Sequence, residues 1–194
     1  MKNRQRLGIY IHIPFCVKKC AYCDFLSGPA GEKEKEEYVK MLVDEIRNCP
    51  DTVQNYRVIS IFFGGGTPSL LTGEQIGRLM DTVREIFTLD EDAEITMEMN
   101  PGTVTEEKLR KYRQAGVNRL SIGLQSVNDE ELRLLGRIHT YEEFLEAYHL
   151  ARANGFANIN VDLISAIPGQ TVESWRRTLE QVMALFPEHI SAYS

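Results

Sequence analysis

Three cysteines within eight residues are the part of this sequence best able to do chemistry. They follow the pattern Cys16-x-x-x-Cys20-x-x-Cys23. Thiolates at this spacing can wrap around one iron–sulfur cluster. A four-iron cluster ordinarily takes four cysteines, so a set of three leaves one iron with an open coordination position. The pattern therefore predicts a cluster that can bind a substrate or cofactor directly.

A structural zinc site is the alternative for these thiols, with His12 as its fourth ligand. His12 lies on an expected strand, where the pleat fixes the direction of its side chain. Zinc ligands also usually come as two separated pairs. We therefore favour the cluster, and we expect the remaining cysteine, Cys49, to be a lone structural thiol near a helix end.

A glycine-rich loop, Gly64-Gly65-Gly66-Thr67-Pro68, directly follows a second expected strand. Glycines let backbone N–H and C=O groups approach a ligand closely. A tight turn without a ligand would use glycine too, and the loop has neither the dinucleotide-binding spacing nor the lysine of a phosphate-binding loop. Its position favours a ligand, because loops that follow parallel strands gather at the end of the sheet where the cysteines are expected.

Polar side chains end three further expected strands, at Glu98, Gln125 and Asp162. Each alone could cap a loop or make hydrogen bonds inside the sheet. Three of them on neighbouring strands, beside a cysteine loop and a glycine loop, favour a ligand with amine and hydroxyl groups. Arg137 could pair with a carboxylate of such a ligand or could be a solvated helix charge, and the pattern leaves both interpretations open.

The elements that must position these residues form a βα repeat. Residue types favoured in strands recur at 7–13, 57–63, 94–99, 119–124, 158–164 and 189–194. Apolar residues at helical spacing lie between them. Capping boxes are expected where Thr103 precedes Glu106 and where Thr140 precedes Glu143.

The strands alternate between apolar and polar side chains more than a sheet covered by helices on both faces should. Strand 94–99, for example, alternates Met97 and Met99 with Glu98 and Asn100. We therefore expect a curled sheet whose polar face lines a lumen. Six strands fall short of a closed barrel, which takes eight strands and about 250 residues. The prediction is an α/β fold, a partial, open-sided (β/α)6 TIM-like barrel with parallel strands. Residues 1–194 are expected to be one domain and the N-terminal part of a longer protein.

Composition excludes several kinds of partner. The net charge of −6 and the pI near 5.3 oppose binding to nucleic acid, and no basic stripe offsets them. No apolar segment approaches the length that spans a membrane. Clustered cysteines in a chain without a targeting signal suggest metal ligation, so a cytoplasmic location is expected.

Taken together, the motifs resemble those of the radical S-adenosylmethionine (SAM) group that contains oxygen-independent coproporphyrinogen III oxidase and its heme-chaperone relatives. The resemblance covers nearly the whole chain. Besides the cysteine triplet and the glycine loop, it is carried by Tyr10-Ile11-His12-Ile13-Pro14-Phe15-Cys16, Glu98-x-Asn100-Pro101, Ser121-Ile122-Gly123-Leu124-Gln125-Ser126, Leu135-Gly136-Arg137-x-His139 and Asp162-Leu163-Ile164.

The resemblance implies a 4Fe-4S cluster on Cys16, Cys20 and Cys23 whose open iron chelates the amino and carboxylate groups of S-adenosyl-L-methionine. One electron then cleaves SAM to methionine and a 5′-deoxyadenosyl radical. The residues implied to bind SAM are Tyr10, Tyr22, Gly65, Gly66, Thr67, Glu98, Gln125, Arg137 and Asp162. Gln125, Arg137 and Asp162 match positions that in the oxidase partly contact a second SAM molecule. The implied partners are heme or a porphyrinogen, an electron donor such as a flavodoxin or ferredoxin, and heme-accepting proteins.

One departure from the oxidase pattern directs the functional prediction. The oxidase carries a fourth cysteine two residues after the third, whereas this sequence has Phe25 in Cys23-Asp24-Phe25. The Cys-Asp-Phe ending is similar to the heme-chaperone branch, whose members bind heme and transfer it. We therefore expect a heme chaperone. A coproporphyrinogen III oxidase and a non-catalytic zinc-stabilised module are the alternatives.

Overall fold

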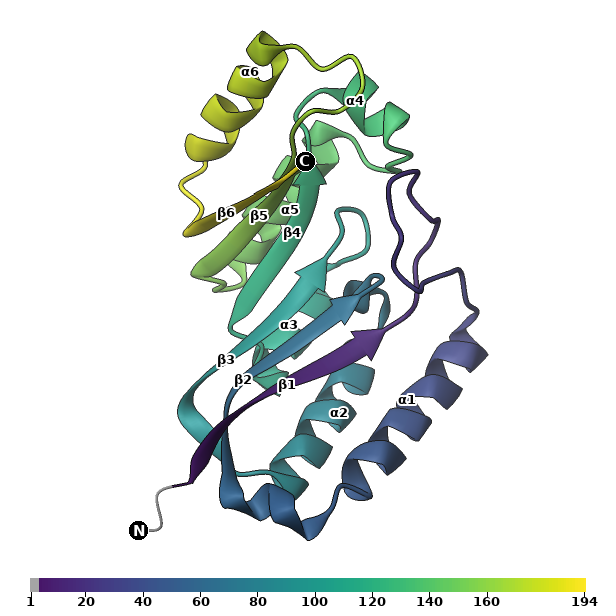
Figure 1. The fold of residues 1–194 in the computed structure, drawn as a ribbon, viewed down its shortest axis with the longest axis vertical. Helices are drawn as coiled ribbons and strands as arrows, with labels where there is room; N and C mark the ends of the chain where they lie inside the picture. Colours follow the sequence, from purple (N-terminus) through teal and green to yellow (C-terminus); the bar gives the residue numbers. More distant parts are fainter. Residues whose placement is uncertain (1–3) are drawn as a thin grey trace.

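The computed structural model describes residues 4–194, and within them six parallel strands form one sheet in the order of the chain. The strands are β1 (Gln5–Ile13), β2 (Tyr56–Gly65), β3 (Leu89–Met99), β4 (Arg119–Gln125), β5 (Asn158–Ile164) and β6 (His189–Tyr193). Strands β1 and β6 are the two edges of this sheet, so it stays open (Figure 1). The predicted partial, open-sided barrel of parallel strands is confirmed.

Helices make the crossovers between the strands and pack on the apolar face of the sheet (Figure 1). They are α1 (Glu32–Arg47), α2 (Gly73–Ile86), α3 (Glu106–Ala115), α4 (Asp129–Leu134), α5 (Tyr141–Ala153) and α6 (Val172–Met183), with 3₁₀ turns at Asp51–Asn55 and Pro68–Leu70. No helix among residues 4–194 is both long and apolar enough to cross a bilayer.

The core lies between the sheet and these helices. Met97, Ile122 and Val161 are fully buried and pack in one cluster with Tyr112 of α3. Burying a side chain of this size contributes about 1.5–3 kcal/mol. The Tyr112 hydroxyl is satisfied inside the core, because it donates a hydrogen bond of 2.6 Å to the carbonyl oxygen of Leu71. The apolar residues of the strand alternation are therefore the ones that hold the helices.

Three local predictions need correction or extension. Strand β3 begins at Leu89 instead of residue 94, because Leu89 already pairs with Val58 of β2; pairing resumes between Glu94 and Ser60 after an irregularity in the register. Helix α4 has too few residues to show a periodic pattern and was not predicted. The cap of α3 is Thr105, which accepts from the backbone of Lys108, whereas Thr103 donates to the carbonyl oxygen of Asn100 instead. The capping box of Thr140 is confirmed.

Candidate functional site

The cysteines lie in the loop that follows β1, at the carboxyl end of the sheet (Figure 1). Two backbone hydrogen bonds close the base of this loop, from Cys16 N to Gly28 O at 2.9 Å and from Gly28 N to Pro14 O at 3.0 Å. A third, from Ala21 N to Leu135 O at 3.0 Å, ties the loop to the end of α4. The loop is thus held in place from two sides although it has no helix or strand of its own.

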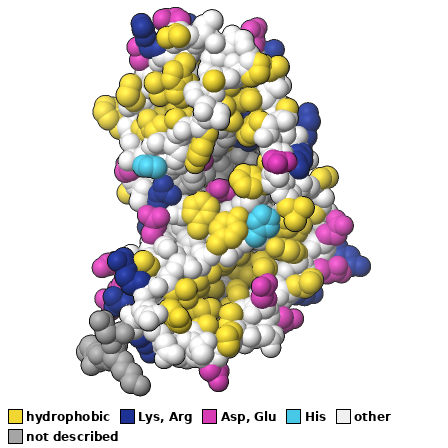
Figure 2. All heavy atoms as spheres, in the orientation of Figure 1, with side chains coloured by type: hydrophobic (Ala, Val, Ile, Leu, Met, Phe, Trp, Pro, Cys, Tyr) yellow, Lys and Arg dark blue, Asp and Glu magenta, His cyan; other side chains and the backbone are white. Residues whose placement is uncertain are grey.

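A cavity of about 360 Å³ opens beside this loop at the carboxyl ends of the strands. Figure 2 shows the corresponding face of the molecule hollowed near its middle. The residues predicted for the site that line the cavity are Cys16, Cys20, Cys23, Tyr22, Gly65, Gly66, Thr67, Glu98, Gln125, Arg137 and Asp162. Tyr10 is the predicted site residue that does not line it. Its side chain is 57% exposed on β1, and its hydroxyl hydrogen-bonds the ring of His12.

The three thiols fit an iron–sulfur cluster better than a zinc ion. All three are free and partly exposed. His12, the candidate fourth zinc ligand, has both ring nitrogens engaged, one with the Tyr10 hydroxyl at 3.0 Å and the other with the Leu26 carbonyl oxygen at 3.2 Å. In the part of the chain that the structure describes, no three His, Cys, Asp or Glu side chains are gathered as one ion would need. A cluster spreads its thiolate ligands over several metal atoms, so it suits three separate thiols.

Cys49 does not contribute to this set. It lies at the end of α1, away from the cavity, and its thiol donates to the carbonyl oxygen of Glu45 at 3.8 Å. The thiol set at the cavity therefore has three members, which is the number that leaves one iron of a four-iron cluster open.

The glycine loop packs against the end of β1 through its backbone. Gly66 N donates to Ile13 O at 2.8 Å, and Thr67 N donates to Phe15 O at 2.7 Å. A Cβ atom added to Gly66 would lie 2.6 Å from the Phe15 carbonyl oxygen. Gly65 has a φ of 111°, a left-handed conformation that favours glycine. These glycines are needed so that the loop can lie directly on the strand that carries the cysteines.

This close contact gives a prediction with an internal control. Gly66→Ala is expected to destabilise the protein by about 1–3 kcal/mol, because the new methyl group meets backbone that cannot rotate away. Gly77→Ala, within α2, has open space around the added Cβ and is expected to stabilise by roughly 0.5–1 kcal/mol. Urea denaturation of both variants measures the difference. Equal stabilities would contradict the packing described for Gly66.

Two carboxyl groups face the cavity from β3 and β5, the strands on either side of β4. Glu98 accepts a hydrogen bond of 3.0 Å from the backbone N–H of Gly65. Burial raises the pKa of Glu98 to about 7, and the negative charge of Asp162 adds to the rise while the Gly65 N–H opposes it. Asp162 accepts 2.8 Å hydrogen bonds from Ser121 and Asn160, and burial raises its pKa as well. A cationic ligand group would favour the charged forms of both carboxyl groups.

Arg137 lies inside the site, so it is not a solvated charge on a helix. Its Nη2 atom donates to Asn100 Oδ1 at 2.6 Å and to the Gly123 carbonyl oxygen at 2.7 Å. Its Nη1 atom is 3.8 Å from Cys20 Sγ and 3.4 Å from the Tyr22 hydroxyl. The guanidinium therefore connects the cysteine loop to strands β3 and β4.

Gln125 holds an uncommon backbone conformation at the end of β4. Its φ is 77°, in the left-handed region, and the β4–β5 register shifts between Gly123 and Gln125. Non-glycine residues in this region are strained and are enriched at functional sites. The side chain is buried at the cavity.

Sequence reasoning missed several residues of the cavity. Asn100, Ser121 and Tyr193 line it, and Asn100 makes contacts with both Arg137 and Thr67. The alternation of apolar and polar residues along β3 and β4 could have identified two of them, because Asn100 and Ser121 fall on the polar face.

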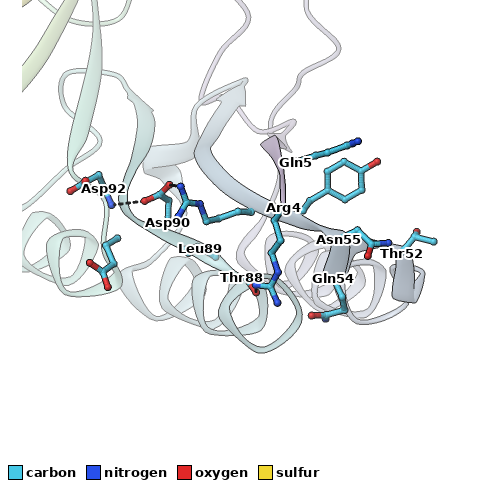
Figure 3. Close-up of a pocket in the computed structure, with 12 residues that line it drawn as sticks. Arg4, Gln5, Thr52, Gln54, Asn55, Thr88, Leu89, Asp90 and Asp92 are labelled. Atoms are coloured by element: carbon cyan, nitrogen blue, oxygen red, sulfur yellow. Dashed lines mark hydrogen bonds and ion pairs between the residues drawn. The ribbon is translucent and has the colours of Figure 1, made fainter. Parts of the chain in front are cut away.

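A second hollow, of about 1450 Å³, lies at the opposite end of the sheet (Figure 3). Two pairs of its side chains contact each other: Arg57 pairs with Asp90 at 2.9 Å, and Arg4 donates to the Thr88 hydroxyl at 2.5 Å. It contains neither the cysteines nor the glycine loop. The amino ends of barrel strands are generally associated with stability and the carboxyl ends with activity, so the smaller cavity is the candidate functional site.

Comparisons with known proteins identify the family of the chain. The sequence profile of the Radical SAM superfamily matches residues 10–182. The heme chaperone HemW of Escherichia coli (strain K12) is 46% identical over 188 residues, which are 96% of this chain and 50% of that protein. The coproporphyrinogen-III oxidase-like protein HemZ of Bacillus subtilis (strain 168) is 38% identical over 199 residues, 98% of this chain and 39% of that protein.

Among solved structures, coproporphyrinogen III oxidase (HemN) from Escherichia coli superposes on all of this chain with a TM-score of 0.89 and 36% identity. The match covers 44% of the oxidase chain. The chain thus spans about half or less of the length of these relatives.

Proposed function

The chain belongs to the radical SAM superfamily, and we propose that Cys16, Cys20 and Cys23 are the ligands of the 4Fe-4S cluster that this family implies. Support comes from three free thiols at one cavity and from the position of Cys49 outside it. When bound, the cluster supplies the electron for reductive cleavage of SAM. The remaining residues of the site bind and orient that cofactor.

The cavity offers polar partners for both charged groups of the methionyl part of SAM, the amino group and the carboxylate. Glu98 and the backbone of Gly65, Gly66 and Thr67 are proposed to receive the methionyl end, where the buried carboxyl group would gain a cationic partner. Arg137 and Gln125 offer donors from the other side of the cavity, and Asp162 offers acceptors. Tyr10 and Tyr22 are proposed to border the same site from the cysteine side.

For the whole protein we propose that it is a heme chaperone, which binds and transfers heme. The observation that carries this proposal is Phe25: where the oxidase has a fourth cysteine, this chain presents a phenylalanine that is 64% exposed and lines the cavity. The sequence similarity to proteins named heme chaperones supports it. A porphyrinogen oxidase is the second candidate, because the superposition on that enzyme covers this whole chain.

An anaerobic activity assay separates the two functions. The reconstituted full-length protein, supplied with SAM, a reductant and coproporphyrinogen III, is expected to release no decarboxylated product and to bind heme, followed by its absorption band. Rapid formation of the doubly decarboxylated product would overturn the chaperone proposal. The oxidase superposed above, assayed in parallel, controls for inactive reagents.

Further partners follow from the same proposal. We propose heme or a porphyrinogen as the ligand, a flavodoxin or ferredoxin as the electron donor, and heme-accepting proteins as recipients, with a cytoplasmic location. Residues 1–194 are proposed to be the radical SAM core domain of the protein, of which the structure describes residues 4–194.

A further inference from the structure

A continuous set of hydrogen bonds links Arg137 to Cys16. Arg137 Nη2 donates to Asn100 Oδ1 at 2.6 Å, Asn100 Nδ2 donates to Thr67 Oγ1 at 2.8 Å, and Thr67 Oγ1 lies 3.6 Å from Cys16 Sγ. The same guanidinium has its Nη1 atom 3.8 Å from Cys20 Sγ. Two of the three proposed ligand sulfurs therefore connect to one arginine, a link that the proposed SAM-binding role of Arg137 does not use.

The chemistry of arginine sets the direction of every bond in this set. A guanidinium can only donate, so the amide oxygen of Asn100 must face Arg137 and its NH₂ group must face Thr67. The Thr67 oxygen then accepts from Asn100. Its hydroxyl hydrogen is left for Cys16 Sγ, the remaining acceptor in reach among the contacts described for this hydroxyl.

Asn100 is held in this position through its own backbone. Its N–H donates to Ser69 Oγ at 3.2 Å, and its carbonyl oxygen accepts from Thr103 Oγ1 at 2.6 Å. The Ser69 and Thr103 hydroxyls contact each other at 2.6 Å. Ser69 and Thr67 are both buried, with exposed fractions of 0% and 2%. The amide is therefore preorganised, and water does not compete for the Thr67 hydroxyl.

We propose that Asn100 is a positioning residue that keeps the Thr67 hydroxyl as a donor to Cys16, and that this bond, with Arg137 beside Cys20, raises the reduction potential of the cluster. The inference rests on the proposed cluster ligands. A donor to a ligand sulfur stabilises the reduced cluster more than the oxidised one, because the reduced cluster carries one more negative charge. The electron comes from an external low-potential donor, and no bond is made or broken in the protein.

The test is a redox titration of the reconstituted protein without SAM, followed by electron paramagnetic resonance. Thr67→Val keeps the shape of the side chain and removes the donor. We expect the ratio of reduced to oxidised cluster at a fixed potential to fall about tenfold, which is a shift of about 59 mV for a one-electron couple. Thr67→Ser keeps the hydroxyl and is expected to retain the original potential.

A second variant tests the role of Asn100 itself. Asn100→Asp keeps an acceptor for Arg137 but replaces the NH₂ group with an oxygen, so the Thr67 hydroxyl turns toward the carboxylate and away from Cys16. The potential is expected to fall. In a Thr67→Val background the same substitution is expected to have a smaller effect, because the donor is already gone.

The outcomes distinguish failure of the cluster proposal from failure of the hydrogen-bond proposal. If the original protein takes up no iron and sulfide, the cluster proposal fails and this inference fails with it. If Thr67→Val carries a full cluster at an unchanged potential, the cluster proposal stands and the hydrogen-bond proposal is overturned. Strictly additive shifts for the two substitutions would also overturn it, because they would show that Asn100→Asp acts only through the charge it adds and not through the Thr67 hydroxyl.

Discussion

Replacing Cys20 with alanine is expected to abolish the iron and sulfide content of the anaerobically reconstituted protein, whereas replacing Cys49 with alanine is expected to leave it unchanged. The proposed cluster has three protein ligands at the cavity. Loss of one leaves two thiolates, and the fourth iron position is the one proposed for SAM, so no other thiol among the described residues of the cavity replaces the missing ligand. Cys49 is the matched control because its thiol contacts the Glu45 carbonyl oxygen instead of the cavity.

The measurement is iron and sulfide per chain, together with the visible absorption of the cluster. We expect about four of each in the original protein and in the Cys49 variant. Cys16→Ala and Cys23→Ala are expected to behave as Cys20→Ala does. A Cys20→Ala protein that still held a full cluster would exclude Cys20 as a ligand. Zinc without iron in the original protein would overturn the cluster proposal and restore the zinc-stabilised module.

The fold followed from the sequence because its signals are local. Alternation of Met97 and Met99 with Glu98 and Asn100 is a property of a few neighbouring residues, and it fixes which side of β3 meets the helices. Parallel register then brings the polar ends of strands together, pairing Glu98 with Ser121 across β3 and β4. The sequence alone is therefore enough to predict that the polar residues at the strand ends lie close together.

The details that escaped prediction depend on contacts between distant segments. Arg137 had two interpretations, because its contact with Asn100 spans 37 residues of sequence. Thr103 fits the capping-box pattern with Glu106, which Thr105 with Lys108 does not. The Thr103 hydroxyl nevertheless contacts Ser69 and donates to the Asn100 carbonyl oxygen, and Thr105 caps α3. Local propensity cannot predict which of these competing hydrogen bonds forms, because that depends on where each partner lies in the folded protein.

His139 is expected to make the stability of the protein depend on pH. Its ring is buried, its Nδ1 atom lies 3.4 Å from Arg137 Nη2, and its Nε2 atom lies 3.3 Å from the Leu124 carbonyl oxygen. Because Arg137 can only donate, Nδ1 accepts and Nε2 carries the proton, which describes a neutral ring. Burial and the charge of Arg137 lower the pKa of His139 to about 4.

The unfolded chain takes up the proton near pH 6.5, before the folded protein does, so protonation favours unfolding. The stabilisation from a neutral His139 is complete above pH 6.5 and is lost as the pH falls toward 4, by about 3 kcal/mol in all. Glu98 acts in the opposite direction. Its pKa is raised to about 7, so its contribution is complete below the unfolded value of 4.5 and is lost as the pH rises through 7.

Comparing the stability of the original protein with that of single variants separates the contributions of His139 and Glu98. Urea denaturation of the iron-free protein and of His139→Gln, between pH 4 and 7, is expected to show the original protein gaining about 3 kcal/mol over the variant as the pH rises to 6.5. The stability of the original protein relative to Glu98→Gln is expected to fall as the pH rises, because the folded protein holds the Glu98 proton more tightly than the unfolded chain does. A difference between the original protein and His139→Gln that stays constant with pH would mean that His139 titrates equally in both states, and its neutral, buried assignment would be wrong.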